Sequence, residues 1–149
     1  MRASVIDNAR KLGLELKVVR LPGAASPTEA AAVIGCDDAR MTAVSVFVAD
    51  GDPVVCIACG TRPVDVGLLA DVLDVAELRA ASASEVRAAT GCPIGGVPPF
   101  GHGLPVVLER SLLDHATVWT TAGDGSTVVE VETARLADCT SATVATVSG

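Results

Sequence analysis

The residues best placed to do chemistry lie in one segment, from position 91 to 103, which reads Gly-Cys-Pro-Ile-Gly-Gly-Val-Pro-Pro-Phe-Gly-His-Gly. The segment is uncharged and rich in both glycine and proline. Glycines let backbone amides approach a ligand closely, and prolines fix the path of the chain so that the amides keep their direction. The composition therefore indicates a rigid loop that could bind a ligand or stabilise an oxyanion. A structural crossover with an apolar underside has the same composition, and this alternative stays open.

Side chains with conventional catalytic chemistry are scarce in the sequence. His102, in the loop, is one of 2 histidines and could serve as an acid, a base or a ligand. A hydrogen-bonded loop histidine is the simpler interpretation. His115 follows Asp114 at the start of an expected strand and looks like a surface residue. Histidines so far apart, with no carboxylate pattern beside them, do not predict a metal site.

The run Cys56-Ile57-Ala58-Cys59 has the spacing of a redox or zinc motif, but its context favours a structural role. Residues 53–58 are expected to form a strand, on which residues three apart point to opposite faces. A redox pair belongs at a helix N-terminus, and a zinc site needs a second pair. The sequence contains neither the GxSxG motif of a nucleophile elbow, nor a P-loop motif, nor the GxGxxG motif of a dinucleotide-binding turn. The residues by themselves thus indicate a loop and not yet a reaction.

Composition restricts the class of partner. The chain has 149 residues, 50% of them hydrophobic, which is enough for one domain with a real core and excludes disorder. Its net charge is −7, and its aromatic residues are Phe47, Phe100 and Trp119. Binding nucleic acid along its length needs basic stripes, and stacking several bases needs several exposed rings. We therefore expect no DNA partner, and only local contact with any RNA.

The cellular location is also expected from simple features. The first residues, 1–8, lack the apolar run of a signal peptide. The long uncharged stretch 88–108 contains prolines and glycines that exclude a membrane helix. An odd number of cysteines, 5, suggests reduced thiols. A cytoplasmic protein without membrane contact is the expectation.

Periodicity and capping signals predict the elements that must position the loop. Helices are expected over 5–12, from the capping box Ser26–Glu29 to Gly35, from about Pro63 to Leu73, from the capping box Ser82–Glu85 to Gly91, and from Thr133, as its cap, to Ala137. Strands are expected over 14–19, 44–48, 53–58, 105–109, 116–121, 126–131 and, at an edge, 143–147. Asp50-Gly51 and 123–125 should turn two hairpins. This mixture favours an α+β fold with a largely antiparallel or mixed sheet.

The loop resembles that of the YbaK/EbsC proteins, free-standing relatives of the editing domain inserted in bacterial prolyl-tRNA synthetase. The family's GxxxP motif falls on Gly95 to Pro99. Similar segments follow in family order from about residue 26 to 147: an early helix at 26–31, a central hairpin at 49–54, a turn at 60–65, a helix start at 82–85, a strand at 103–107, and last segments at 111–113 and 118–123. Together they indicate one domain of this type over residues 1–149.

This resemblance implies a mixed, barrel-like β-sheet flanked by helices. It also implies hydrolysis, without metal or cofactor, of the ester that joins a wrong amino acid to the 3′ end of tRNA. In the family the chemistry is attributed to an activated water, backbone donors and the ribose hydroxyl of the substrate. The catalytic loop backbone would be Gly95, Gly96, Val97, Pro98 and Pro99. The substrate-binding residues would be Ala43, Phe47, Phe100, Gly101, His102, Ala122 and Gly123. A homodimer is left open.

One position departs from the family's pattern. The family places a lysine, expected to engage the tRNA end, in the strand before the hairpin, where this chain has Ala43. Arg40 lies upstream, and a strand would aim it at the opposite face. Two hypotheses follow: a deacylase acting in trans on a mischarged small amino acid, or a non-catalytic homologue that binds an aminoacyl-type ligand or a protein partner. Hydrolysis of another small ester or thioester is a third, supported by the loop alone.

Overall fold

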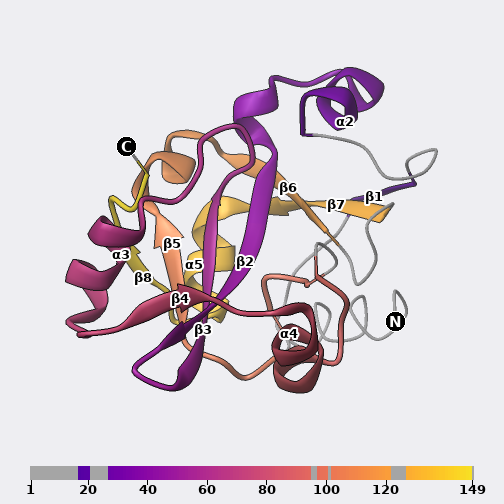
Figure 1. Cartoon of the computed structure of the whole chain (residues 1–149). Coiled ribbons are helices and arrows are strands. Elements are labelled where there is room, and N and C mark those ends of the chain that lie inside the picture. The colour runs from indigo at the N-terminus through magenta and orange to yellow at the C-terminus, as the bar shows by residue number, and fades with distance from the viewer. Residues whose placement is uncertain (1–16, 21–26, 95–96, 101, 122–126, 149) are drawn as a thin grey trace.

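The computed structural model describes residues 17–20, 27–94, 97–100, 102–121 and 127–148 (Figure 1). In chain order its elements are β1 (Lys17–Arg20), α2 (Pro27–Ile34), the 3-10 helix η1 (Asp38–Arg40), β2 (Thr42–Ala49), β3 (Asp52–Cys59), α3 (Val66–Leu73), β4 (Leu78–Ala80), α4 (Ala83–Thr90), β5 (Val106–Glu109), the 3-10 helix η2 (Arg110–Asp114), β6 (Thr117–Thr121), β7 (Thr127–Glu132), α5 (Thr133–Cys139) and β8 (Thr143–Ala145). This mixture of helices and strands confirms the α+β class.

The strands form two sheets that meet at β2. Five strands form a mixed sheet in the order β4-β2-β3-β5-β8, in which β2 is antiparallel to β3 and β4, while β5 is parallel to β3 and β8. The second sheet, β1-β7-β6, is antiparallel. A bridge between Met41 and Trp119 connects β6 to the start of β2. The expectation of a mixed, barrel-like sheet flanked by helices is therefore confirmed.

The long hairpin of β2 and β3 crosses the middle of the molecule (Figure 1). Its turn residues Asp50 and Gly51 have φ angles of 47° and 90°, as a two-residue hairpin with the right-handed twist of its strands requires. The Asp50 carboxylate accepts a hydrogen bond of 2.8 Å from the Glu77 amide, just before β4. The predicted hairpin is thus confirmed, and its turn also positions the next strand.

Helix α4 begins with the predicted capping box. The Ser82 hydroxyl accepts from the Glu85 amide at 3.2 Å, and the Glu85 carboxylate accepts from the Ser82 amide at 3.0 Å. Gly91 ends the helix with a φ of 74°, a conformation that glycine adopts without strain. These two caps determine where the glycine- and proline-rich loop leaves the helix.

Buried side chains from both sheets, α4 and α5 form the main core. Strand β3 is buried on both faces: Cys59 contacts this core, whereas Cys56 belongs to a separate cluster with Phe47 and Leu69. The two thiols therefore point to opposite faces, as the strand prediction required. Burial, with a smaller contribution from Glu109, raises the pKa of Cys56 to about 12. All five cysteines are free.

Other local predictions are confirmed with shifted ends or corrected. Helix α3 begins at Val66 and not near Pro63, because Asp65 is its N-cap and accepts from the Leu68 amide at 3.1 Å. The prediction that Thr133 caps the last helix is wrong. Thr133 is the first residue of α5, is 1% exposed, and donates its hydroxyl hydrogen to the carbonyl oxygen of His115 at 2.8 Å. Because the Thr133 hydroxyl is bonded to a residue distant in the sequence, it does not cap the helix.

Four further predictions concern the chain ends and the membrane. The edge strand expected over 143–147 is confirmed as β8, paired with β5. The helix expected over 5–12 lies outside the described residues, and β1 is the described part of the strand expected over 14–19. None of the described helices combines the length and the apolarity needed to cross a membrane.

Candidate functional site

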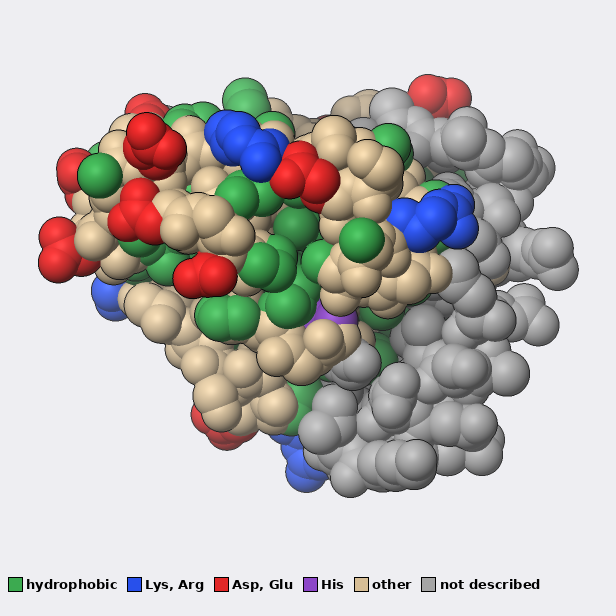
Figure 2. Space-filling view, turned by 60° about the horizontal axis from the view of Figure 1, so that its bottom comes forward, with side chains coloured by type: hydrophobic (Ala, Val, Ile, Leu, Met, Phe, Trp, Pro, Cys, Tyr) green, Lys and Arg blue, Asp and Glu red, His purple; other side chains and the backbone are tan. Residues whose placement is uncertain are grey.

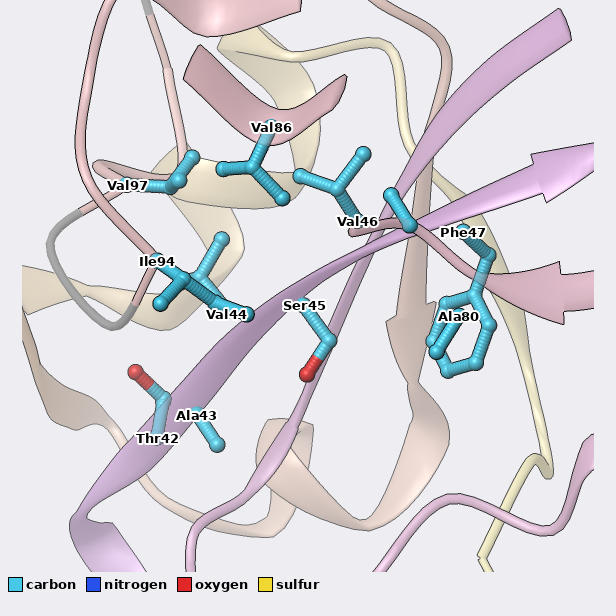
Figure 3. A pocket seen from close by; sticks show the side chains of 11 residues that line it. Thr42, Ala43, Val44, Ser45, Val46, Phe47, Ala80, Val86, Ile94 and Val97 are labelled. Carbon is cyan, nitrogen blue, oxygen red and sulfur yellow. The ribbon is translucent and has the colours of Figure 1, made fainter. Parts of the chain in front are cut away.

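A cavity of about 410 Å³ opens between β2, the start of α4 and the loop (Figure 3). It is lined by Thr42, Ala43, Val44, Ser45, Val46, Phe47, Ala80, Ala81, Val86, Ile94 and Val97. These side chains are uncharged, and the hydroxyls of Thr42 and Ser45 are their only polar groups. The cavity is therefore suited to a small group with a largely apolar surface.

Strand alternation divides the lining of the cavity into two faces. Val44 and Val46 point toward Val86, Ile94 and Val97, and they contact the main core (Figure 3). Residues 43, 45 and 47 point to the other face of the strand. Because both faces of β2 contribute, the cavity runs along the edge of this strand and not over one of its surfaces.

Residues 97–100 of the loop are buried. Val97 and Phe100 belong to the main core, and Val97 also lines the cavity. Pro98, Pro99 and Phe100 are not among the lining residues. The loop therefore has the apolar underside of a structural crossover and at the same time contributes one wall of the cavity.

His102 holds the two arms of the loop together. Its Nδ1 accepts a hydrogen bond from the Leu104 amide at 3.0 Å, so Nε2 carries the proton and donates to the Pro99 carbonyl oxygen at 3.1 Å. Burial lowers the pKa of His102, against the smaller opposing effect of the Pro99 hydrogen bond. The neutral ring is thus favoured, and neither nitrogen is free to act as a base. These contacts match the interpretation of a hydrogen-bonded loop histidine.

The position of the family lysine is open to the cavity but carries no charge. Ala43 is exposed and lines the cavity. Arg40 is directed elsewhere: it donates to the Glu130 carboxylate at 2.7 Å and to the Thr117 carbonyl oxygen at 3.0 Å, and it contacts the Thr117 hydroxyl. Arg40 is therefore bonded to the second sheet and is not among the residues that line the cavity.

Of the residues expected to form the site, the structure brings Ala43, Phe47 and Val97 together at the cavity. His102 and Phe100 lie in the loop without lining the cavity. Gly95, Gly96, Gly101, Ala122 and Gly123 lie outside the described residues. Within the described ranges, no group of three His, Cys, Asp or Glu side chains is arranged to hold a metal ion.

Sequence reasoning missed several lining residues. The strand neighbours Val44, Ser45 and Val46 could have been found, because a cavity at a strand edge takes residues from both faces of that strand. The remaining missed residues are Thr42, Ala80, Ala81, Val86 and Ile94. Ala80, Ala81 and Val86 come from the β4–α4 connection, and no sequence pattern indicated that it lies beside β2.

Residues 22–139 match the family model of the aminoacyl-tRNA editing domain. Since this match covers most of the chain, the chain belongs to the aminoacyl-tRNA editing domain family. The resemblance to the YbaK/EbsC proteins and to the editing domain of prolyl-tRNA synthetase is thereby confirmed.

Individual relatives agree with this assignment. The proline–tRNA ligase of Nitratidesulfovibrio vulgaris (strain DP4) is 32% identical over 111 residues, which are 74% of this chain and 19% of that protein. The proline–tRNA ligase of Solidesulfovibrio magneticus is 36% identical over 95 residues, 63% of this chain and 16% of that protein. The chain thus spans less than a fifth of these curated relatives.

A solved structure matches over nearly its whole length. It is the crystal structure of a protein proposed as a trans-editing enzyme for prolyl tRNA synthetase. The TM-score is 0.91 at 30% identity, and the match covers 99% of this chain and 96% of the other. The protein in that crystal structure therefore has the same fold as this chain, and the match covers nearly all of both chains.

Proposed function

We propose that the protein hydrolyses, in trans, the ester bond between a mischarged small amino acid and the 3′ end of a tRNA. The observation that carries the proposal is the cavity, which β2 bounds on one side and the loop with the GxxxP motif bounds on another. Membership of the editing-domain family and the match to a free-standing relative support it. The corresponding role is that of a cytoplasmic protein that improves the fidelity of translation.

The chemistry proposed for the site needs few side chains. Water attacks the ester carbonyl, negative charge develops on the carbonyl oxygen, and the ribose oxygen leaves with a proton from the water. The products are a free amino acid and a tRNA with a free 3′ end. In our proposal the loop amides at Gly95, Gly96 and Val97 donate to the oxyanion, while the prolines have no amide to offer. One such donor contributes about 2.7–4 kcal/mol to catalysis.

The proposed contact with tRNA is local. On the described part of the face shown in Figure 2, several acidic side chains gather toward the left, and basic side chains are scattered. With a net charge of −7, such a surface does not attract an extended polynucleotide. A cavity for the terminal aminoacyl-adenosine needs only a few contacts. We therefore expect weak tRNA binding.

The direct test is deacylation. The protein is incubated with tRNAs charged with alanine, serine, cysteine or proline, and ester loss is followed over time. We expect at least one ester to be lost faster than in buffer, and both Gly95→Val and Pro99→Ala to slow this loss. Pro63→Ala, in an exposed turn outside the cavity, is the matched control and should keep the wild-type rate.

A second candidate function rests on Ala43. Because no lysine or arginine is among the described residues that line the cavity, a non-catalytic homologue that binds an aminoacyl-type ligand or a protein partner is the alternative. If the wild type hydrolyses none of these esters and the Ala43→Lys variant is active, the enzyme proposal is rejected. Binding of an uncleaved aminoacyl analogue by such an inactive protein would support the alternative.

A further inference from the structure

The main-chain hydrogen bonds of β2 show which of its residues direct their N–H and C=O groups toward the cavity. The Gly60 amide donates to the Met41 carbonyl oxygen at 2.7 Å, so the main chain of Met41 faces β3. The Ala81 amide donates to the Val46 carbonyl oxygen at 3.0 Å, so the main chain of Val46 faces the opposite side. Main-chain groups of an antiparallel strand alternate in direction. The N–H and C=O of Val44 therefore point away from β3, toward the cavity edge.

Neighbouring strands cover this edge at both ends but not at its centre. Strand β4 pairs with β2 over Phe47–Ala49, and the Ala81 amide extends this coverage to Val46. At the other end, β6 reaches β2 through the bridge between Met41 and Trp119, and the Thr42 hydroxyl donates to the Trp119 carbonyl oxygen at 2.9 Å. Among the described residues, Val44 is the one outward-facing position of β2 that meets neither strand.

We propose that the main chain of Val44 pairs with the aminoacyl group of the substrate as if it were one residue of an added strand. This inference rests on the proposed function. An aminoacyl ester carries an ammonium group and a carbonyl on either side of its α carbon, which are the groups that a strand residue presents. Opposed residues of an antiparallel pair exchange two N–H···O bonds. The Val44 C=O accepts from the ammonium, and its N–H donates to the ester carbonyl. Because the uncovered edge of β2 is one residue long, it has room for one amino acid.

This pairing determines where the substrate side chain goes. In an antiparallel pair, directly opposed residues place their side chains on the same face of the sheet. The face of Val44 carries the buried side chains of Val46, Val86 and Val97, while Ile94, 64% exposed, lies at the rim. The Thr42 hydroxyl donates its only hydrogen to the Trp119 carbonyl oxygen, so it has none to donate to a substrate hydroxyl. The site therefore favours a small apolar side chain over a hydroxylated one, and it selects L over D amino acids.

The protein variant that tests the proposal is Val44→Pro, measured with adenosine that carries L-alanine in amide linkage at its 3′ carbon. Because the Val44 N–H makes no ladder bond to β3, proline removes the outward donor and leaves the hairpin ladder intact. We expect the Kd to rise about tenfold. Val44→Ala keeps the N–H and serves as the matched control, with a rise of less than about threefold. Thermal unfolding of each variant establishes that it is folded.

A comparison of three ligands on the wild-type protein gives a second test, which does not depend on whether Val44→Pro folds. The wild type should bind the L-alanyl compound about tenfold more tightly than its D-alanyl isomer, and about tenfold more tightly than the propionyl compound, which has no amine. The proposal is overturned if the wild type binds all three equally or binds none at millimolar concentration. It is also overturned if folded Val44→Pro binds as the wild type does, or if a short extended peptide competes better than the alanyl compound.

These outcomes separate the inference from the proposed function. Selective binding of the L-alanyl compound without hydrolysis of any charged tRNA would reject the deacylase and support pairing at Val44. Hydrolysis of charged tRNA that is indifferent to Val44→Pro would support the deacylase and overturn the pairing.

Discussion

His102 stabilises its loop as a neutral side chain. Its Nδ1 is the acceptor for the Leu104 amide, and protonation of that nitrogen would break the bond. Burial lowers the pKa of the folded histidine, whereas a histidine in the unfolded chain titrates near about 6.5. Below that pH this histidine binds more protons in the unfolded chain than in the folded one, so its contribution to stability falls as the pH falls.

We therefore predict that part of the acid sensitivity of the protein disappears in His102→Gln. Urea unfolding at pH 7.5 and 5.5 should show a decrease in the wild-type free energy of unfolding that is smaller in the variant. At pH 7.5 the variant should be less stable by about 1 kcal/mol, because its loop hydrogen bonds are poorer. His115→Gln, at the histidine outside the loop, is the control, because it leaves both hydrogen bonds of His102 in place. Equal slopes for the wild type and His102→Gln would contradict the assignment.

At the scale of elements, α4 links local sequence to the cavity. Its capping box determines where the helix starts, Val86 on its buried side lines the cavity, and Gly91 ends it just before the loop. Arg79, from β4, pairs with Glu85 through contacts of 2.7 and 2.8 Å. The hydrogen bond from Arg79, with those at the cap, lowers the pKa of Glu85 to about 2. Glu85 is therefore ionised throughout the physiological range. It can accept from the Ser82 amide and pair with Arg79 at any physiological pH.

Removal of the cap should destabilise the protein by a moderate amount. For Ser82→Ala we predict a loss of about 1 kcal/mol in the free energy of unfolding, measured with urea, because the amide of Glu85 loses its acceptor. Ser84→Ala, an exposed position in the first turn of the same helix, should change stability by less than about 0.5 kcal/mol. Equal effects of the two substitutions would argue against the capping role.

At the scale of the whole molecule, Arg40 joins the two sheets. It precedes β2 in the five-stranded sheet and bonds to Thr117 of β6 and Glu130 of β7 in the other. The side chains of this ion pair are each 27% exposed, so solvent screens it only in part. This contact fastens one end of β2 and thereby helps to define the uncovered edge at Val44.

Arg40→Ala should therefore act on stability and not on the reaction. We predict a loss of about 1 kcal/mol or more in the free energy of unfolding, with an unchanged deacylation rate per folded molecule. Arg135→Ala removes an exposed contact of 3.4 Å with Glu132 and should have a smaller effect. A specific loss of deacylation in Arg40→Ala, without a loss of stability, would show instead that Arg40 substitutes for the family lysine.

The sequence by itself determined the features that depend on neighbours along the chain. The turn at Asp50-Gly51, the capping box at Ser82 and the stop at Gly91 were predictable because backbone conformation and capping are local. The unusual loop was recognisable because glycine and proline restrict the backbone wherever they occur. Its family resemblance led to the same domain type that the comparisons show.

Tertiary structure alone decided what these local features surround. Thr133 lost its expected capping role to a bond with His115, a partner distant in the sequence. The β4–α4 connection lines the cavity beside β2, and Val44 lies between the ends of β4 and β6. Which main-chain groups of a strand remain uncovered depends on where its neighbours end. That depends on packing among segments far apart in the chain, which no local pattern contains.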